Sequence, residues 1–256
     1  CNACARSCLT NSKLIQMLIS TEAIALSTIK YSESSVIFKC YTLSNGIKSY
    51  IIKGIRSKKN KSLSLGLFQP MTILEINANH KNNGGLENMR AAKILAPYRT
   101  IPFDIIKNSL VLFISEVLSK SILEEEKNSV LFNYIKSSAL WLDSSKKYVN
   151  FHIQFLIKIL KYLGISPNFE ENLDFFENSK NQFDYSDDFN DKISRKFIEK
   201  FEFLLGTNFD DGVKCNISNE ERKEFLEFLM SYMSIHIGGF RRPNSLNIMY
   251  ELFKKE

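Results

Sequence analysis

The chain has 256 residues, 44% of them hydrophobic, and carries a formal net charge of +6. This length can bury a sizeable core without disulfides or metals, and no apolar run reaches the ~18 residues of a membrane span, so a transmembrane protein is excluded. No secretory signal is expected, because the N-terminus lacks a basic segment followed by a long apolar stretch. The five cysteines are too few and too scattered for a disulfide scaffold, which predicts the reducing cytosol.

The charge is divided unevenly along the chain. Residues 1–100 carry 14 Lys and Arg against 4 Asp and Glu, whereas residues 101–256 carry 20 against 24. A strongly basic segment predicts that the first part of the chain meets a polyanion. The alternative is a basic surface that serves only solubility.

The first sixteen residues show neither a strand period nor a helix period. Cys1 and Cys4 have the spacing of a metal-binding pair, with Cys8 nearby, but zinc needs four ligands and no second His or Cys pair lies close in sequence. We therefore expect residues 1–16 to be a non-native or disordered extension without a metal. Met17 is the expected start of the folded chain.

Residues 17–96 have the pattern of short strands. In the second of these, Val36, Phe38 and Cys40 alternate with the residues between them, and Asn45 and Gly46 then supply a turn. The strands are expected at residues 19–29, 36–41, 47–53, 71–78 and 86–90. Five short strands in ~75 residues predict a small barrel, most commonly a five-stranded oligonucleotide-binding (OB) barrel, although the pattern also allows an SH3-like barrel.

A dense run of cations covers the third expected strand and the loop after it. Six fall within residues 48–61, and no acidic residue lies among them. Lysines and arginines on a loop beside a barrel face are placed as contacts to backbone phosphates require. The predicted DNA-binding residues are Lys30, Lys48, Lys53, Arg56, Lys58, Lys59 and Lys61. Tyr31, Tyr41 and Tyr50 are candidates for base stacking, or else are half-buried strand residues.

Beyond residue 96 the apolar period changes to 3.6, which predicts a helical domain over residues 97–256. Ser218 and Glu221 form a capping box, and Gly164 is a natural helix stop. The helices are expected at residues 102–123, 129–142, 148–164, 192–205, 218–232 and 245–253. Residues 168–191 are rich in Asn, Asp and Glu and are expected to form a loosely structured polar excursion.

No motif in the sequence indicates catalysis. His80, His152 and His236 are scattered, and no phosphate-binding loop of the GxxxxGK[ST] type occurs. The chain is therefore predicted not to be an enzyme and to need no cofactor. A basic barrel joined to a helical domain favours an accessory factor that binds nucleic acid.

Five stretches, in chain order, resemble the RecO family of bacterial recombinational repair proteins. The first two strands of the family are similar to ISTEAIALSTIKYSESSVIFKCYT, its KG-x-R-x-x-K segment to IIKGIRSKKNK, and its LQP strand to LFQPMTILEI. Its long central helix is similar to FHIQFLIKILKYLGISPNF, and its closing helix to RRPNSLNIMYELF. Together these stretches extend over nearly the whole chain from Met17 onward.

The resemblance implies an N-terminal OB domain and a helical C-terminal domain. It implies binding to single- and double-stranded DNA, annealing of complementary strands, partnership with RecR, contact with the C-terminal tail of single-strand-binding protein, and help in loading RecA. These activities belong in the bacterial cytoplasm, at the nucleoid during repair. Many members carry a four-cysteine zinc site after the central helix, but only Cys215 stands in that region here, so no zinc is expected.

The tail of single-strand-binding protein is acidic and ends in Phe with a free carboxylate, so its site needs an apolar pocket beside a cation. The resemblance places a basic pair where Lys146 and Lys147 stand, beside the apolar stripe of Phe151 and Phe155. Arg241 with Arg242 is the second choice. The alternative is that Lys146 and Lys147 only solvate a helix end.

Two other functions stay open from the sequence. An OB-fold RNA-binding or translation-associated factor could use the same basic loop. A nucleic-acid enzyme whose active site shows no motif is the third possibility.

Overall fold

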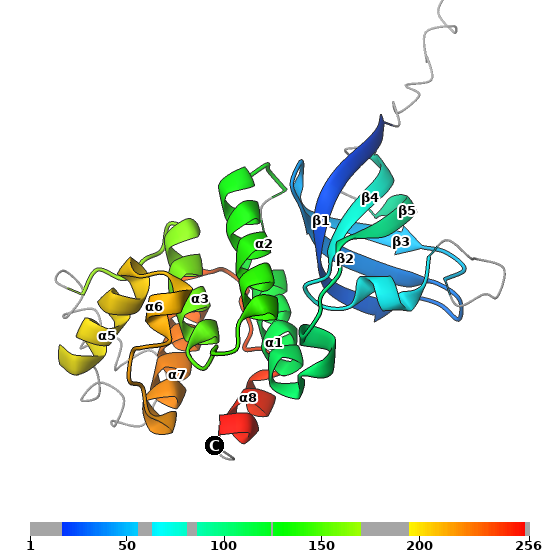
Figure 1. Cartoon of the computed structure of the whole chain (residues 1–256). Helices are drawn as coiled ribbons and strands as arrows, with labels where there is room; N and C mark the ends of the chain where they lie inside the picture. Colours follow the sequence, from blue (N-terminus) through cyan, green and yellow to red (C-terminus); the bar gives the residue numbers. More distant parts are fainter. Residues whose placement is uncertain (1–16, 56–62, 81–85, 124, 170–194, 254–256) are drawn as a thin grey trace, which may run out of the picture. The chain divides into compact units, whose positions relative to one another are not determined.

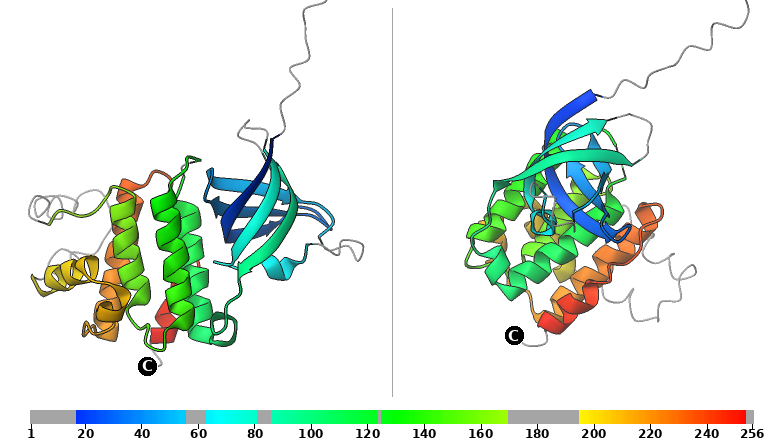
Figure 2. Two further views of the ribbon diagram at one scale, coloured as in Figure 1. Left: turned by 45° about the horizontal axis from the view of Figure 1, so that its top comes forward. Right: turned by 90° about the vertical axis from the view of Figure 1, so that its right-hand side faces the viewer.

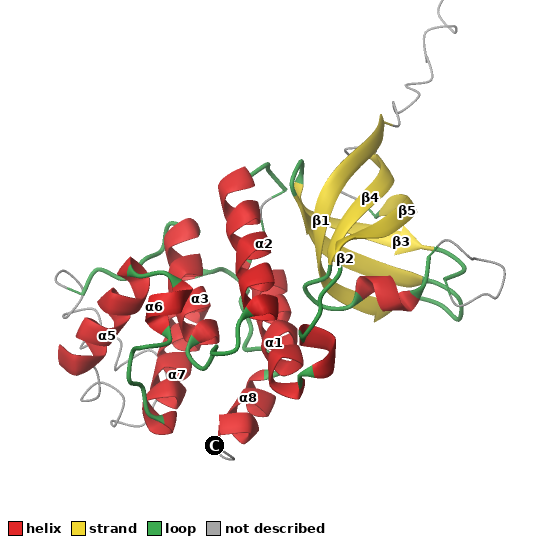
Figure 3. Ribbon diagram, in the orientation of Figure 1, coloured by secondary structure: helices red, strands yellow, loops and turns green. Residues whose placement is uncertain are grey.

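The computed structural model describes residues 17–55, 63–80, 86–123, 125–169 and 195–253 (Figure 1). Within this part, the residues up to Ala96 together with Glu125–Lys127 form one compact unit, and the residues from Pro97 onward form the other. Figure 3 shows that all the strands belong to the first unit. The expected extension at residues 1–16 and nearly all of the expected polar excursion at 168–191 lie outside the described residues.

The first unit is a closed five-stranded barrel with the strand order β1-β2-β3-β5-β4. The parallel pairing of β3 with β5 closes it, and all the other pairings are antiparallel. Its strands are β1 (Met17–Lys30), β2 (Val36–Thr42), β3 (Gly46–Ile52), β4 (Ile73–His80) and β5 (Glu87–Ala96). The predicted OB barrel is therefore confirmed, and the SH3-like alternative is wrong.

Alternation along the strands fills the barrel, because successive side chains point to opposite faces. Val36, Phe38 and Cys40 of β2 lie in the buried core with Tyr50 and Ile52 of β3. The residues between them are therefore on the outer face. A short 3-10 helix, η1 (Leu65–Phe68), adds the buried ring of Phe68 to this core.

The last strand is longer than the sequence pattern indicated. The predicted strand ended at Arg90, but β5 continues to Ala96 and pairs with β4 along its length, including Ala91 with Asn77 and Ala92 with Ile76. Alanine has a low strand propensity, so the pairing with β4 decides the conformation here.

The second unit is helical, and Figure 2 shows its first three helices, α1 to α3, side by side. Its helices are α1 (Ile105–Ser121), α2 (Ser129–Ser144), α3 (Phe151–Tyr162), α5 (Arg195–Gly206), α6 (Phe209–Gly212), α7 (Asn219–His236) and α8 (Leu246–Phe253), with a 3-10 turn η2 (Ile101–Phe103) before α1. The six predicted helices are confirmed, and the capping box of Ser218 and Glu221 is present. Among the described residues, no helix is both long and apolar enough to span a membrane.

Helix α3 is buried nearly all round, and the amide side chains of its residue Gln154 and of its N-cap residue Asn150 hold the segment that contains α6. The Gln154 Nε2 atom lies 2.9 to 3.1 Å from the carbonyl oxygens of Leu204, Thr207 and Asn208. Asn150 Nδ2 donates to the carbonyl oxygens of Gly212, at 3.0 Å, and Cys215, at 2.8 Å. These bonds add donors to carbonyl groups at and beside helix ends, where intrahelical partners run out.

Candidate functional site

Two of the predicted DNA-binding cations of the barrel lie at strand ends. Lys30 ends β1, Lys53 directly follows β3, and both are exposed. The remaining members of the predicted cluster, Arg56, Lys58, Lys59 and Lys61, lie outside the described residues. Their role as phosphate contacts stays a prediction.

Lys48 has a different environment from Lys30 and Lys53. It pairs with Cys40 across β2 and β3, on the row that faces the barrel interior. Its side chain is only 10% exposed, and its Nζ lies 2.6 Å from a carboxylate oxygen of Glu125. A lysine neutralised in this way has little of its charge left for a phosphate, so Lys48 is the least suited of the three.

The outer face of the barrel carries an apolar row across β1, β2 and β3. Ile29 lies opposite Ile37, which lies opposite Ile51. Ile29 is 61% exposed, and the other two are half-buried. A row of this kind can contact bases and sugars while cations beside it reach the phosphates.

Lys39 belongs to this outer face and was not among the predicted DNA-binding residues. It lies opposite Ser27 of β1 and Ser49 of β3, in the row next to the isoleucines. It is half-buried, and this burial lowers the pKa of its ammonium group. The sequence signal for Lys39 is the strand alternation itself, because a residue next to the inward-facing Phe38 points to the outer face.

Only one of the three tyrosines considered for base stacking has an accessible ring. Tyr41 and Tyr50 are 1% and 0% exposed, whereas Tyr31, just after β1, is 59% exposed. Stacking on a base requires an open ring face. Tyr31 is therefore the candidate that the structure favours.

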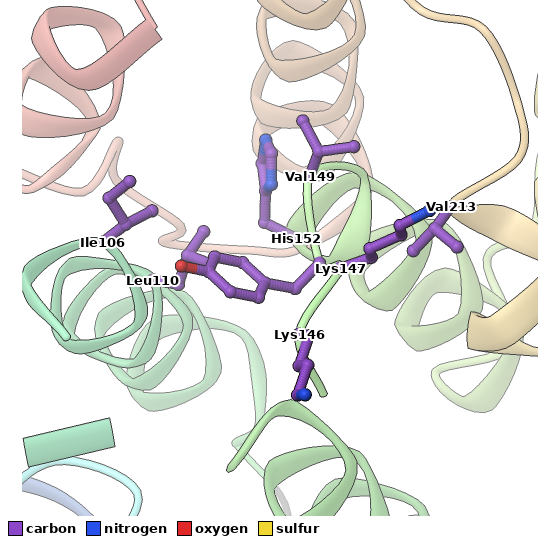
Figure 4. A pocket seen from close by; sticks show the side chains of 8 residues that line it. Ile106, Leu110, Lys146, Lys147, Val149, His152 and Val213 are labelled. Atoms are coloured by element: carbon purple, nitrogen blue, oxygen red, sulfur yellow. The ribbon is translucent and has the colours of Figure 1, made fainter. Parts of the chain in front are cut away.

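A second candidate site is a cavity of about 280 Å³ in the helical unit (Figure 4). Ile106 and Leu110 lie on one side of it, and Val149 and Val213 lie on the other. The residues that line it are Ile106, Leu110, Lys146, Lys147, Tyr148, Val149, His152 and Val213. The two lysines singled out in the sequence therefore border one cavity with apolar walls.

Phe151 and Phe155 do not line this cavity, although the sequence placed them beside the two lysines. Phe151 is 2% exposed and Phe155 is fully buried. Their rings pack in an aromatic cluster in which Phe151 lies 5.7 Å from Trp141 and 5.0 Å from Phe209. Because α3 is apolar on nearly every side, its period could not show which side faces the cavity.

His152 lines the cavity without adding charge to it. The imidazole is fully buried, and burial together with the nearby charge of Arg222 lowers its pKa to about 3. The ring is therefore neutral at ordinary pH. The positive charge of the cavity comes from Lys146 and Lys147, which are both exposed.

Arg241 and Arg242 are the second choice for the peptide site, and Arg242 already forms an ion pair with Glu227. The Arg242 guanidinium lies 2.8 Å from the Glu227 carboxylate and also donates to Ser231 Oγ at 3.2 Å. Arg241 is exposed. Both arginines are exposed, but the charge of Arg242 is already paired with a carboxylate.

Among the residues that the structure describes, no three His, Cys, Asp or Glu side chains are grouped so as to hold a metal ion. Cys215 is half-buried, and Cys1, Cys4 and Cys8 lie outside the described residues. The expected absence of zinc stays a prediction.

Comparison with known proteins gives matches along most of the chain. The family model described as "Recombination protein O N terminal" matches residues 17–98, and "Recombination protein O C terminal" matches residues 102–246. The chain is 39% identical to the DNA repair protein RecO of Flavobacterium psychrophilum and 40% identical to that of Flavobacterium johnsoniae. It is 31% identical to that of Bacteroides fragilis, and each comparison covers 93% of this chain and 100% of the relative.

Proposed function

The chain belongs to the RecO family of DNA repair proteins, and from this premise we propose that its barrel binds single- and double-stranded DNA and anneals complementary strands. The observation that carries the proposal is the outer barrel face, where the row of Ile29, Ile37 and Ile51 is accompanied by lysines. Annealing brings two polyanions together, so cations that neutralise phosphates lower its barrier. Before the strands pair, the apolar row and Tyr31 would contact their unpaired bases.

We further propose that the cavity of the helical unit binds the C-terminal tail of single-strand-binding protein. The apolar walls suit a phenyl ring, and Lys146 and Lys147 suit the terminal carboxylate and the acidic residues before it. Binding of this tail would bring the barrel to DNA strands that the other protein already covers.

In this proposal the chain is a mediator and not an enzyme. Together with RecR it helps to load RecA onto DNA coated by single-strand-binding protein, and its place of action is the bacterial nucleoid during repair. The family membership supports this role. The alternative of an RNA-binding or translation-associated factor is tested by the same experiment as the DNA proposal.

The test is annealing of complementary strands, with the DNA affinity measured over a salt series. A Lys39→Gln, Lys53→Gln variant should anneal more slowly, and the slope of log K against log salt should fall by roughly 1.4 if both lysines contact phosphates of a single strand. A Lys196→Gln, Lys223→Gln variant removes the same charge from exposed positions of the helical unit and serves as the control. Equal slopes for the two variants would refute the barrel site, and RNA competing better than DNA would favour the alternative function.

A further inference from the structure

Lys107 is a buried lysine in the first turn of α1, with 3% of its surface exposed. Its Nζ donates to Thr100 Oγ1 at 2.7 Å and to the carbonyl oxygens of Asp143 at 3.1 Å and Ser145 at 2.7 Å. An ammonium group has three N–H donors, and a buried one is tolerated only where such bonds replace water. All three donors of Lys107 are therefore used within the protein.

On one side, this cluster holds the segment that follows β5 in the chain. The Asp143 carboxylate accepts hydrogen bonds from the backbone N–H groups of Arg99, at 2.9 Å, Thr100, at 2.8 Å, and Ile101, at 2.9 Å. Burial raises the pKa of Asp143, but these N–H groups outweigh it and hold the pKa below its usual value. Residues 99–101 are thus fixed by one carboxylate, whose own backbone carbonyl is bound by Lys107.

On the other side, the cluster holds the segment that carries the two cavity lysines. Ser145 comes directly before Lys146, and its carbonyl oxygen accepts from Lys107. At the other end, Tyr148 donates its hydroxyl to Asp104, the N-cap of α1, at 2.7 Å, and its ring centroid lies 5.0 Å from the Lys107 Nζ. The start of α1 therefore holds both ends of residues 145–148, and Lys146 and Lys147 of this segment line the cavity.

We propose that Lys107 is a positioning residue for the cavity, and that it links the segment presenting Lys146 and Lys147 to residues 99–101. This inference rests on the peptide site proposed above. A ligand that orders the cavity segment then also orders residues 99–101, and the coupling acts equally in the reverse direction. Binding of a peptide in the helical unit is in this way communicated to the chain that leaves the last barrel strand.

A purely structural role for Lys107 can be separated from this one by a control on the same helix. Glu116 of α1 accepts from the backbone N–H groups of Asn244 and Ser245 and so holds the segment before α8. A Glu116→Gln variant loses stability without touching the cavity or residues 99–101. It matches Lys107→Met, which keeps the apolar stem but removes the charge and the three donors.

The experiment uses the full chain and a labelled synthetic peptide that is rich in Asp and ends in Phe with a free carboxylate. Peptide affinity is measured by fluorescence anisotropy, and amide exchange is followed by NMR at Arg99, Thr100 and Ile101. In the wild type, saturating peptide should slow exchange at these three amides. Lys107→Met should weaken binding about tenfold and abolish the slowing, Lys107→Arg should restore both, and Glu116→Gln should behave as the wild type.

Each other result separates the inference from the proposed function. Wild-type affinity in Lys107→Met overturns the positioning role. Peptide binding to the wild type without slower exchange at residues 99–101 overturns the link but leaves the peptide site intact. If the wild type does not bind the peptide, the proposed site fails, and the positioning role is judged by amide exchange at residues 146–148, which must rise in Lys107→Met. Should that variant not fold, Thr100→Val, which removes one acceptor, must show a smaller change in the same direction.

Discussion

In the barrel, Lys30 and Lys53 are exposed and Lys39 is half-buried on the outer face, whereas in the helical unit Lys107 and Arg222 are 3% and 9% exposed. The difference follows from how the two units provide hydrogen-bond partners for their backbone N–H and carbonyl groups. Strands in a closed barrel bond to one another, so the barrel needs few buried polar side chains, and of its described cations Lys48 is the one held on an interior-facing row, by Glu125. Helices leave carbonyl and N–H groups at their ends, and this unit satisfies several of them with buried polar side chains.

A charged or amide side chain therefore means different things in the two units. In the barrel, an outward cation is a candidate contact for a phosphate. In the helical unit, buried polar residues such as Asn150 and Gln154 hold segments in place. The exposed lysines Lys146 and Lys147 differ from these buried residues because they border a cavity.

The largest effect on stability is expected from removing one of these buried amide side chains. Replacing Gln154 by Leu leaves the carbonyl groups of Leu204, Thr207 and Asn208 without that donor. The carbonyl of Asn208 keeps the N–H of Gly212 and that of Thr207 keeps Lys158, but the hydrogen bonds of a buried amide are lost, so the free energy of unfolding of the helical unit should fall by about 3 kcal/mol. The measurement is urea denaturation followed by the fluorescence of the single tryptophan, Trp141, which lies in this unit.

The matched control for Gln154→Leu is Ser137→Ala at an exposed position of α2. It should change the unfolding free energy by no more than about 0.5 kcal/mol. If both variants are equally stable, water replaces the Gln154 amide, and the buried polar side chains of the helical unit do not stabilise the segments that they contact.

This contrast also explains which features the sequence could predict. Strand alternation predicted the strand that carries Val36, Phe38 and Cys40, which lie in the core, and the 3.6 period located six helices, because both patterns are local. The extension of β5 to Ala96 depends on pairing with a distant strand, and α6 is a four-residue helix that Asn208 caps. Neither has a periodic signal of its own.

The candidate functional residues also differ in whether the sequence alone gives a signal for them. Lys146 and Lys147 were found through the family resemblance, and they border the cavity. The sequence places Lys48 among the exposed cations, because its partner Glu125 lies 77 positions further along the chain and leaves no local signal. Lys107 gave no signal, since a single lysine on an apolar helix is normally assigned to its solvent side.

A smaller effect is expected from acid on the contact between α1 and the segment before α8. Burial raises the pKa of Glu116, but bonds from Lys120, Ser245 and Asn244 outweigh it and lower the pKa to about 2, below its ordinary value of 4.5. Since the folded-state pKa is the lower one, this stabilisation is complete above about pH 4.5 and is lost as the pH falls toward about 2.

The measurement compares the wild type with Glu116→Gln in urea. The wild type should be more stable by about 2 kcal/mol near pH 6, and the difference should shrink near pH 3. Comparing the two proteins at each pH cancels the titration of other carboxylates, such as Asp104 and Asp143. A difference that does not change with pH would show that the Glu116 carboxylate makes no charge-dependent contribution.

The smallest effect, and the sharpest test of the division between the units, concerns the exposed lysines of the cavity. A Lys146→Glu, Lys147→Glu variant should bind the acidic, Phe-ended peptide about tenfold more weakly, because exposed ion pairs contribute about 1 kcal/mol or less each. The loss should diminish at high salt, since salt screens exposed charges. An Arg241→Glu variant, at an exposed position that does not line the cavity, should bind as the wild type does. The opposite pattern, with full affinity in the double variant and a loss in Arg241→Glu, would move the peptide site to Arg241 and Arg242 and leave Lys146 and Lys147 as solvated ends of a helix connection.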